Sequence, residues 1–146
     1  MTVEGEPEAS FLALLRGPLG RKSVVRGCAN GECGACRVMV NGQLRASCAL
    51  VLREIPEGAE IATREDVEHE PPVMGTLAAF EAERPTRCRL CVGGLAVTAH
   101  HLAVHGEEGA ERMSAAIEDA LVHATCMCTG RGSLRRALHT SLVRGD

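Results

Sequence analysis

Apolar and polar positions alternate in the first half of the chain and follow a longer period in the second. In residues 37–46 (RVMVNGQLRA), apolar side chains alternate with others on both sides of the Asn41-Gly42 pair. Such alternation around a two-residue Asn-Gly turn predicts a β-hairpin. Residues 11–15 (FLALL) form one apolar helical face that stops at the Gly-Pro pair of residues 17–18. We therefore expect the first half to hold one short helix and to be rich in strands.

The second half changes to the spacing of amphipathic helices. The apolar positions that mark four helices are Val73, Leu77 and Phe80; Leu95, Ala99 and Leu102; Met113, Ile117 and Leu121; and Leu134, Leu138 and Leu142. A proline pair precedes the first helix, Pro85 closes it, and Gly106 ends the second. Four short helices suggest a small bundle. The change of period predicts a domain boundary near residues 66–71, which divides the chain into 1–66 and 67–146.

The composition fits a globular chain with small cores. Of 146 residues, 45% are hydrophobic, but only two are Phe and none is Tyr or Trp, so each half has limited apolar area to bury. Small cores need additional links, which the eight cysteines can supply through metal ligation. The start, MTVEGEPEAS, lacks the features of a signal peptide, and no apolar run reaches transmembrane length. We therefore expect a cytoplasmic protein, in which cysteines stay reduced and serve as metal ligands or redox groups.

The first group of cysteines lies in a glycine-rich segment, residues 27–36 (GCANGECGAC). Cys28, Cys33 and Cys36 have the Cys-x4-Cys-x2-Cys spacing of a plant-type [2Fe–2S] cluster, and Cys48 follows as a fourth thiolate. The glycines allow the tight backbone that wraps a cluster, and they expose N–H groups to its sulfurs. A structural zinc site is the alternative, although such sites commonly use paired Cys-x2-Cys knuckles. Disulfides are disfavoured by the reducing compartment.

A second group of four cysteines lies in the helical half. Cys88 and Cys91 form one pair, Cys126 and Cys128 form the other, and each pair directly precedes an expected helix. Helix N-terminal dipoles would favour an anionic cluster there, and Thr129 is a good N-cap. Taken alone, the two pairs fit zinc as well as a cluster. The first group of cysteines favours a second [2Fe–2S] cluster.

Together, GCANGECGAC with Cys48, then CRLC and CMCTG, resemble the iron–sulfur subunit of the xanthine oxidase family of molybdenum hydroxylases. The resemblance spans nearly the whole chain and uses all eight cysteines in the family's order. It implies an α+β fold, with an N-terminal β-grasp, plant-type ferredoxin-like domain in residues 1–66. An all-α four-helix-bundle domain would follow in residues 67–146, and each domain would hold one [2Fe–2S] cluster.

The resemblance also implies the partners. A large subunit would carry a molybdopterin dinucleotide and a medium subunit would carry FAD, giving a heterotrimer that dimerises in some members. The small subunit performs no bond chemistry. Electrons from substrate oxidation would pass from molybdenum to the helical-domain cluster, then to the ferredoxin-like cluster, then to FAD. Cys128 would lie close to the pterin. Purines and other N-heterocycles, aldehydes and carbon monoxide all remain open as substrates, and the final electron acceptor is equally open.

Three features depart from the family pattern. Arg87 stands where the family usually has a Gln that contacts the pterin, so we expect Arg87 to bind a phosphate or another acidic group of the cofactor. Met127 and Arg131 replace two habitual residues in CMCTGR. The N-terminus is short, so the first β-grasp strand is expected to be missing or replaced. A missing strand would leave an exposed sheet edge, which invites pairing with a partner chain.

Other residues favour simpler interpretations. His100, His101 and His105 lie on one expected helix without a further ligand in the pattern, which favours an ordinary solvent or interface helix. The Arg135-Arg136 pair and Glu32 are expected on solvated surfaces. Basic residues are scattered, and the net charge is −3, so nucleic-acid binding is not expected. The competing functions are a free-standing ferredoxin-type carrier, which would not need the second group of cysteines, and a zinc-stabilised interaction module.

Overall fold

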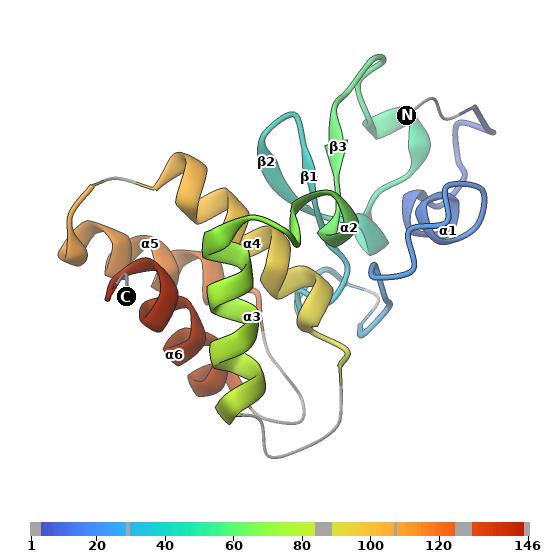
Figure 1. Ribbon diagram of the computed structural model, residues 1–146. Helices are drawn as coiled ribbons and strands as arrows, with labels where there is room; N and C mark the ends of the chain where they lie inside the picture. The colour runs from blue at the N-terminus through green and yellow to red at the C-terminus, as the bar shows by residue number, and fades with distance from the viewer. Residues whose placement is uncertain (1–3, 29, 84–88, 107, 125–129, 145–146) are drawn as a thin grey trace.

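The computed structural model describes residues 4–28, 30–83, 89–106, 108–124 and 130–144. In Figure 1 the helices of the second half gather on one side of the molecule, and a small sheet with helix α1 occupies the other. Helix α4 lies between them, because it packs on strands β1 and β2 as well as on its neighbouring helices. Within the described residues, no helix has the length and apolar character needed to cross a membrane.

The first half contains helix α1 (Phe11–Arg16) and three strands, β1 (Arg37–Val40), β2 (Gln43–Ala46) and β3 (Ile61–Ala62). The strands are antiparallel in the order β2-β1-β3. The predicted hairpin is confirmed: Asn41 and Gly42 turn between β1 and β2 with φ of 49° and 77°. The half is less rich in strands than expected, because short 3-10 turns at Ser47–Ala49 and Leu52–Glu54 replace extended chain.

No strand precedes β1 among the described residues 4–28 and 30–36, although Ser10 forms an isolated bridge with Val51. Strands β2 and β3 are therefore the two edges of the described sheet. The sheet has only one central strand.

Strand β1 is shared by two apolar cores. Val38 and Val40 pack with Phe11 and other residues of the first core, whereas Met39 belongs to the core of the helical half. This division follows from the strand geometry, because successive side chains point to opposite faces. A central strand buried on both faces therefore joins the two halves.

The four predicted helices of the second half are confirmed. They are α3 (Pro71–Glu83), α4 (Val92–His105), α5 (Ala110–Leu121) and α6 (Gly130–Leu142). Helix α4 is central, and all its residues from Val92 to Ala99 are buried. Gly106 follows its last turn, as predicted, whereas Pro85 lies outside the described residues.

A short helix, α2 (Arg64–Val67), connects the two halves. Thr63 is the N-cap of this helix, and the Thr63 backbone N–H donates to the Asp66 carboxylate (2.8 Å). Val67 is buried in the core of the helical half. The predicted division between residues 66 and 67 falls inside this helix and stays a prediction.

Candidate iron–sulfur sites

The first site is formed by the loop before β1 and by the 3-10 turn after β2. The loop carries Cys28, Cys33 and Cys36, and the turn carries Cys48. Buried Ser47 joins the two segments, because its hydroxyl donates to the Cys36 carbonyl oxygen (2.8 Å). The hairpin therefore returns the fourth predicted ligand to the other three.

Backbone N–H groups of these segments point at the cysteine sulfurs. The N–H of Cys33 donates to Cys28 Sγ, that of Ala35 to Cys33 Sγ, and that of Cys48 to Cys36 Sγ, each at 3.4 Å. Gly34 supports this geometry with a φ of 78°, a conformation that other residues rarely adopt. N–H donors of this kind stabilise the negative charge on ligand sulfurs.

The thiols differ strongly in acidity. Burial raises the pKa of Cys28, but the backbone N–H groups of Cys33 and Asn30 outweigh it, so that the pKa is about 6. At Cys48, burial and the neighbouring Cys36 thiol raise the pKa to about 12. These effects group the thiols as two close pairs, Cys28 with Cys33 and Cys36 with Cys48.

This donor set fits a two-iron cluster. Two irons joined by bridging sulfides each need two thiolates, and the four cysteines supply two pairs. Within the part of the chain that the structure describes, no three Cys, His, Asp or Glu side chains are grouped to hold a single metal ion. Gly27 packs closely on this donor set. A Cβ atom at Gly27 would lie 2.6 Å from Cys33 Sγ, so a larger residue does not fit there.

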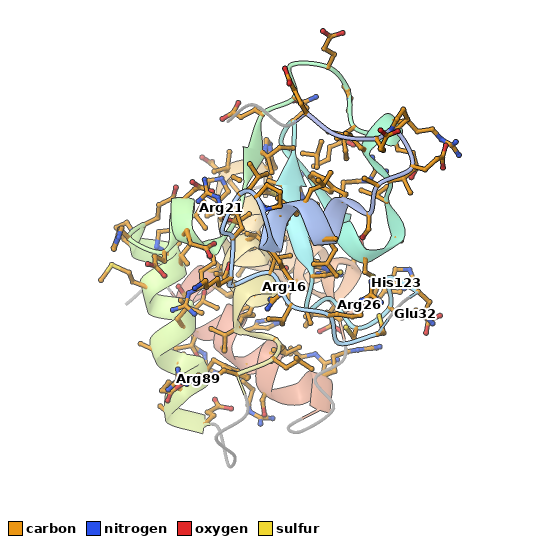
Figure 2. The ribbon with its side chains drawn as sticks, turned by 90° about the vertical axis from the view of Figure 1, so that its right-hand side faces the viewer. Arg16, Arg21, Arg26, Glu32, Arg89 and His123 are labelled. Atoms are coloured by element: carbon orange, nitrogen blue, oxygen red, sulfur yellow. The ribbon has the colours of Figure 1, made fainter. Side chains whose placement is uncertain are left out.

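The outer side of the first site reaches the surface. Cys28 is partly exposed, and Arg26 and Glu32 beside it are exposed, as expected for Glu32. Figure 2 presents this face, with Arg26, Glu32 and His123 labelled on it. Cys33 and Cys36 are buried on the inner side of the loop.

Of the second group of cysteines, the structure describes Cys91 alone. It is buried and lies directly before the first residue of α4. Cys88, Cys126 and Cys128 lie outside the described residues, as do Arg87, Met127 and Thr129, so their convergence stays a prediction. Arg131 is exposed in the first turn of α6 and donates to the Val122 carbonyl oxygen (3.3 Å).

The first site packs directly on the start of α4. A Cβ atom at Gly94 would overlap the carbonyl oxygen of Gly34, and one at Gly93 would overlap that of Ser23. Both glycines lie within the first turn of α4 and are buried. Their role is close approach: only glycines allow the cluster loop to touch the helix backbone.

A small cavity at this contact is lined by cysteines from both groups, Cys33 and Cys91. Arg37 and Thr98 line it as well, and Arg37 Nη1 donates to Thr98 Oγ1 (3.1 Å). Sequence reasoning missed Arg37. Its signal is the position directly after Cys36, on the same strand face as the buried Met39.

The remaining candidates have structural contacts. His100 lies 2.6 Å from the Glu70 carboxylate, and His101 contacts the Gly42 carbonyl oxygen at the hairpin turn (3.2 Å). These contacts support the interface interpretation of this helix. Arg135 and Arg136 of α6 also form ion pairs within the chain, Arg135 with Glu118 and Arg136 with Glu83.

Comparisons with known proteins agree with this site. Residues 1–66 match the model of the 2Fe-2S iron-sulfur cluster binding domain. The nicotinate dehydrogenase small FeS subunit of Eubacterium barkeri is 30% identical over 139 residues, covering 95% of this chain and 86% of the relative. The xanthine dehydrogenase iron-sulfur-binding subunit of Escherichia coli O157:H7 is 32% identical over 111 residues, covering 76% of this chain and 69% of the relative.

A solved structure shows the same fold within a larger protein. The aldehyde oxidoreductase of Desulfovibrio desulfuricans superposes with a TM-score of 0.78 and 26% identity. The match covers 98% of this chain but only 16% of that enzyme. With the cluster-domain match and the two subunit relatives, this chain belongs to the iron–sulfur small subunits of the xanthine oxidase family of molybdenum hydroxylases.

Proposed function

We propose that this chain binds two [2Fe–2S] clusters and relays electrons between a molybdopterin-containing large subunit and an FAD-containing medium subunit. The observation that carries the proposal is that Cys33 of the first group and Cys91, the described member of the second, line one small cavity. A free-standing carrier needs only the first group. A helix start packed against the cluster loop through two glycines favours a fixed relay.

In this proposal the thiolates of Cys28, Cys33, Cys36 and Cys48 would hold the first cluster. When bound, each cluster supplies a centre that accepts and releases one electron. The chain's own contribution is to hold the thiolates in pairs and to direct backbone N–H groups at their sulfurs. These donors favour the more negative, reduced state.

The second cluster is assigned to Cys88, Cys91, Cys126 and Cys128. Support comes from the position of Cys91 at the start of α4, a helix of 14 residues. The positive end of the helix dipole lies there and favours an anionic group. We also assign pterin contacts to Arg87 and Cys128, on the family pattern alone.

The proposed order runs from molybdenum to the second cluster, then to the first cluster and to FAD. Burial supports it, because Cys91 is enclosed whereas Cys28 reaches the surface beside exposed Arg26 and Glu32. The exposed side of the first site is where an electron acceptor can approach. Among the described residues, Cys28, Cys33, Cys36 and Cys48 form no disulfide, which also fits the reducing cytoplasm, where we place the complex.

Metal analysis tests the two-cluster proposal. The full chain, purified without oxygen, should contain about four irons and four acid-labile sulfides and should give two reduced-state EPR signals. A zinc-stabilised module would be colourless. Two irons with one zinc in protein that has lost no iron would refute the second cluster.

The order is tested in the complex purified with its native partners. A panel of purines, nicotinate-like heterocycles and aldehydes would first identify a substrate that reduces it. A Cys48→Ser variant should then let substrate reduce the second cluster while FAD stays oxidised. Rapid FAD reduction in a Cys88→Ser variant that lacks only the second cluster would refute the order.

The cofactor role of Arg87 has a separate test. Replacing Arg87 with Gln should leave both clusters in place, because Arg87 is not among their proposed ligands. Molybdopterin retention in the complex should fall, because a neutral amide cannot match the charge of a guanidinium on an acidic group. Unchanged molybdopterin content and turnover would refute the assignment.

A further inference from the structure

Arg37 is a basic residue that lines the same cavity as Cys33 and Cys91. It begins β1 directly after Cys36, and the alternation of the strand puts it on the face of Met39, which is buried toward the helices. Its guanidinium Nη1 reaches α4 and donates to Thr98 Oγ1 (3.1 Å). The side chain therefore crosses the contact between the two halves beside Cys33 and Cys91.

The charge of Arg37 lies beside ligand sulfurs of the first site. Arg37 directly follows Cys36, is only partly exposed, and lines one cavity with Cys33. Burial lowers the pKa of Arg37, and the charges of Cys36 and Cys33 oppose this effect. Arginine nonetheless keeps its proton in proteins. Among the ion pairs within the described residues, none joins Arg37 to an Asp or Glu, so the ligand sulfurs are the anionic groups that face it there.

Thr98 fixes the position of this charge. Thr98 is 2% exposed, and its hydroxyl donates to the Gly94 carbonyl oxygen (2.7 Å) while accepting from Arg37. Gly94 in turn touches the loop of the first site at Gly34. Thr98 of the helical half therefore holds the guanidinium of Arg37, which belongs to strand β1 of the first half.

We propose that Arg37 tunes the first cluster electrostatically: its charge raises the reduction potential, and Thr98 holds it in place. This inference rests on the proposed function, since it needs a cluster on Cys28, Cys33, Cys36 and Cys48. The cluster gains one negative charge on reduction, so a nearby fixed cation stabilises the reduced state more than the oxidised state. The packing of the helical half then sets the potential of the ferredoxin-like half.

The test is an EPR-monitored redox titration of the full chain with both clusters present. In Arg37→Met, the reduced-to-oxidised ratio of the first cluster should fall about tenfold at the wild-type midpoint, a shift of about 59 mV for one electron. Arg37→Lys keeps the charge and should stay within about twofold of wild type. Arg37→Gln provides a second neutral variant if Arg37→Met loads poorly.

A second pair of variants separates charge from packing. Thr98→Val removes the acceptor but leaves the arginine, so it should lower the midpoint by less than Arg37→Met does. Thr98→Ser keeps a hydroxyl and should restore the wild-type value. An unchanged midpoint in both neutral Arg37 variants, or equal shifts in the Lys and Met variants, would overturn the proposal. A wild-type chain without a first-cluster signal would instead refute the proposed function.

Discussion

The two cysteine groups are supported by different kinds of backbone. The first is held by a loop whose N–H groups point at the sulfurs and whose outer side reaches solvent at Cys28. The described member of the second, Cys91, is buried at the start of a helix whose first eight residues, Val92–Ala99, are all buried. An irregular loop supplies many donors and a surface for partners, whereas a buried helix start supplies one fixed dipole. This difference supports the proposed order, in which the first site exchanges electrons with a partner subunit and the second site carries an interior step of the relay.

The contact between the loop of the first site and the start of α4 is made by backbone. A Cβ at Gly94 would overlap the Gly34 carbonyl oxygen, and Gly34 itself has a φ of 78° that disfavours a larger residue. Interiors this dense respond to small additions of volume. The difference between the two sites can be tested by removing a ligand cysteine from each site in turn. Smaller effects are expected from changing the contact between the loop and α4, and the smallest from changing an exposed ion pair of the helical half.

The largest effect is expected from ligand removal. Cys36 is 1% exposed and is a proposed ligand of the first cluster, so Cys36→Ser should abolish that cluster and half of the iron. Cys91→Ser should abolish the other half. Iron analysis with EPR of both variants checks this result. Complete iron loss in either one would mean that the two sites do not form independently.

A smaller effect is expected at the contact. Gly94→Ala should lower the free energy of unfolding by about 1–3 kcal/mol, because the added methyl group meets the Gly34 backbone and not a flexible side chain. Gly132 in α6 is the matched control, since its Cβ would meet only the end of Arg136. Gly132→Ala should be neutral or stabilising by up to about 1 kcal/mol, through helix propensity. Urea denaturation of the intact protein measures both.

Equal losses of unfolding free energy in Gly94→Ala and Gly132→Ala would contradict a special role for the contact between Gly94 and the loop of the first site. A change in the first-cluster EPR line shape in Gly94→Ala alone would support it. Such a change would show that the helix start shapes the loop.

Glu65 joins helix α2 to the segment at Ser23 by hydrogen bonds and should have a smaller, pH-dependent effect. Its carboxylate accepts from the Ser23 N–H (2.9 Å), the Ser23 hydroxyl (2.6 Å) and the Thr63 hydroxyl (2.7 Å). Burial opposes ionisation, but these donors outweigh it and lower the pKa of Glu65 from its ordinary 4.5 to about 2. Its contribution is therefore complete above about pH 4.5 and is lost as the pH falls toward 2.

Glu65→Gln should cost about 1 kcal/mol at pH 7, allowing for solvent screening of a partly exposed group. The difference from wild type should narrow below about pH 4.5. Glu68→Gln is the matched control, because Glu68, directly after α2, pairs with Arg64 of the same helix (3.0 Å) and not with the segment at Ser23. Urea denaturation at several pH values measures both variants. A difference that widens on acidification would contradict the assigned pKa direction.

Local patterns predicted the local elements. The Asn41-Gly42 turn and the helices after Pro72 were readable because two-residue turns and helical faces depend on neighbours in sequence. The amount of sheet was overestimated, because ligand-bearing segments such as Ser47–Ala49 form 3-10 turns where alternation suggested strand. A short apolar run in the sequence does not distinguish a strand from a 3-10 turn.

The cysteine spacing predicted the first site, but not its surroundings. Arg37 meets Thr98 across 61 positions of sequence, and no periodicity reports such a contact. Gly93 and Gly94 in the first turn of α4 are needed because Ser23 and Gly34 approach the helix there, and the sequence alone does not report that approach. Contacts between the halves are set by tertiary packing.

The smallest effect is expected at the periphery, where Arg136 of α6 pairs with Glu83 of α3 inside the helical half. The Arg136 side chain is 60% exposed, so solvent screens the pair and the side chains lose entropy in forming it. Arg136→Gln should therefore change the free energy of unfolding by no more than about 0.5 kcal/mol and should leave both EPR signals unchanged. Arg136→Lys keeps the charge, and its free energy of unfolding should be indistinguishable from that of Arg136→Gln within error. Urea denaturation at low and high salt measures the contribution, which should shrink as salt rises. A cost above that of Glu65→Gln would mean that the exposed ion pair between α3 and α6, and not the hydrogen bonds between α2 and the segment at Ser23, makes the larger polar contribution to stability.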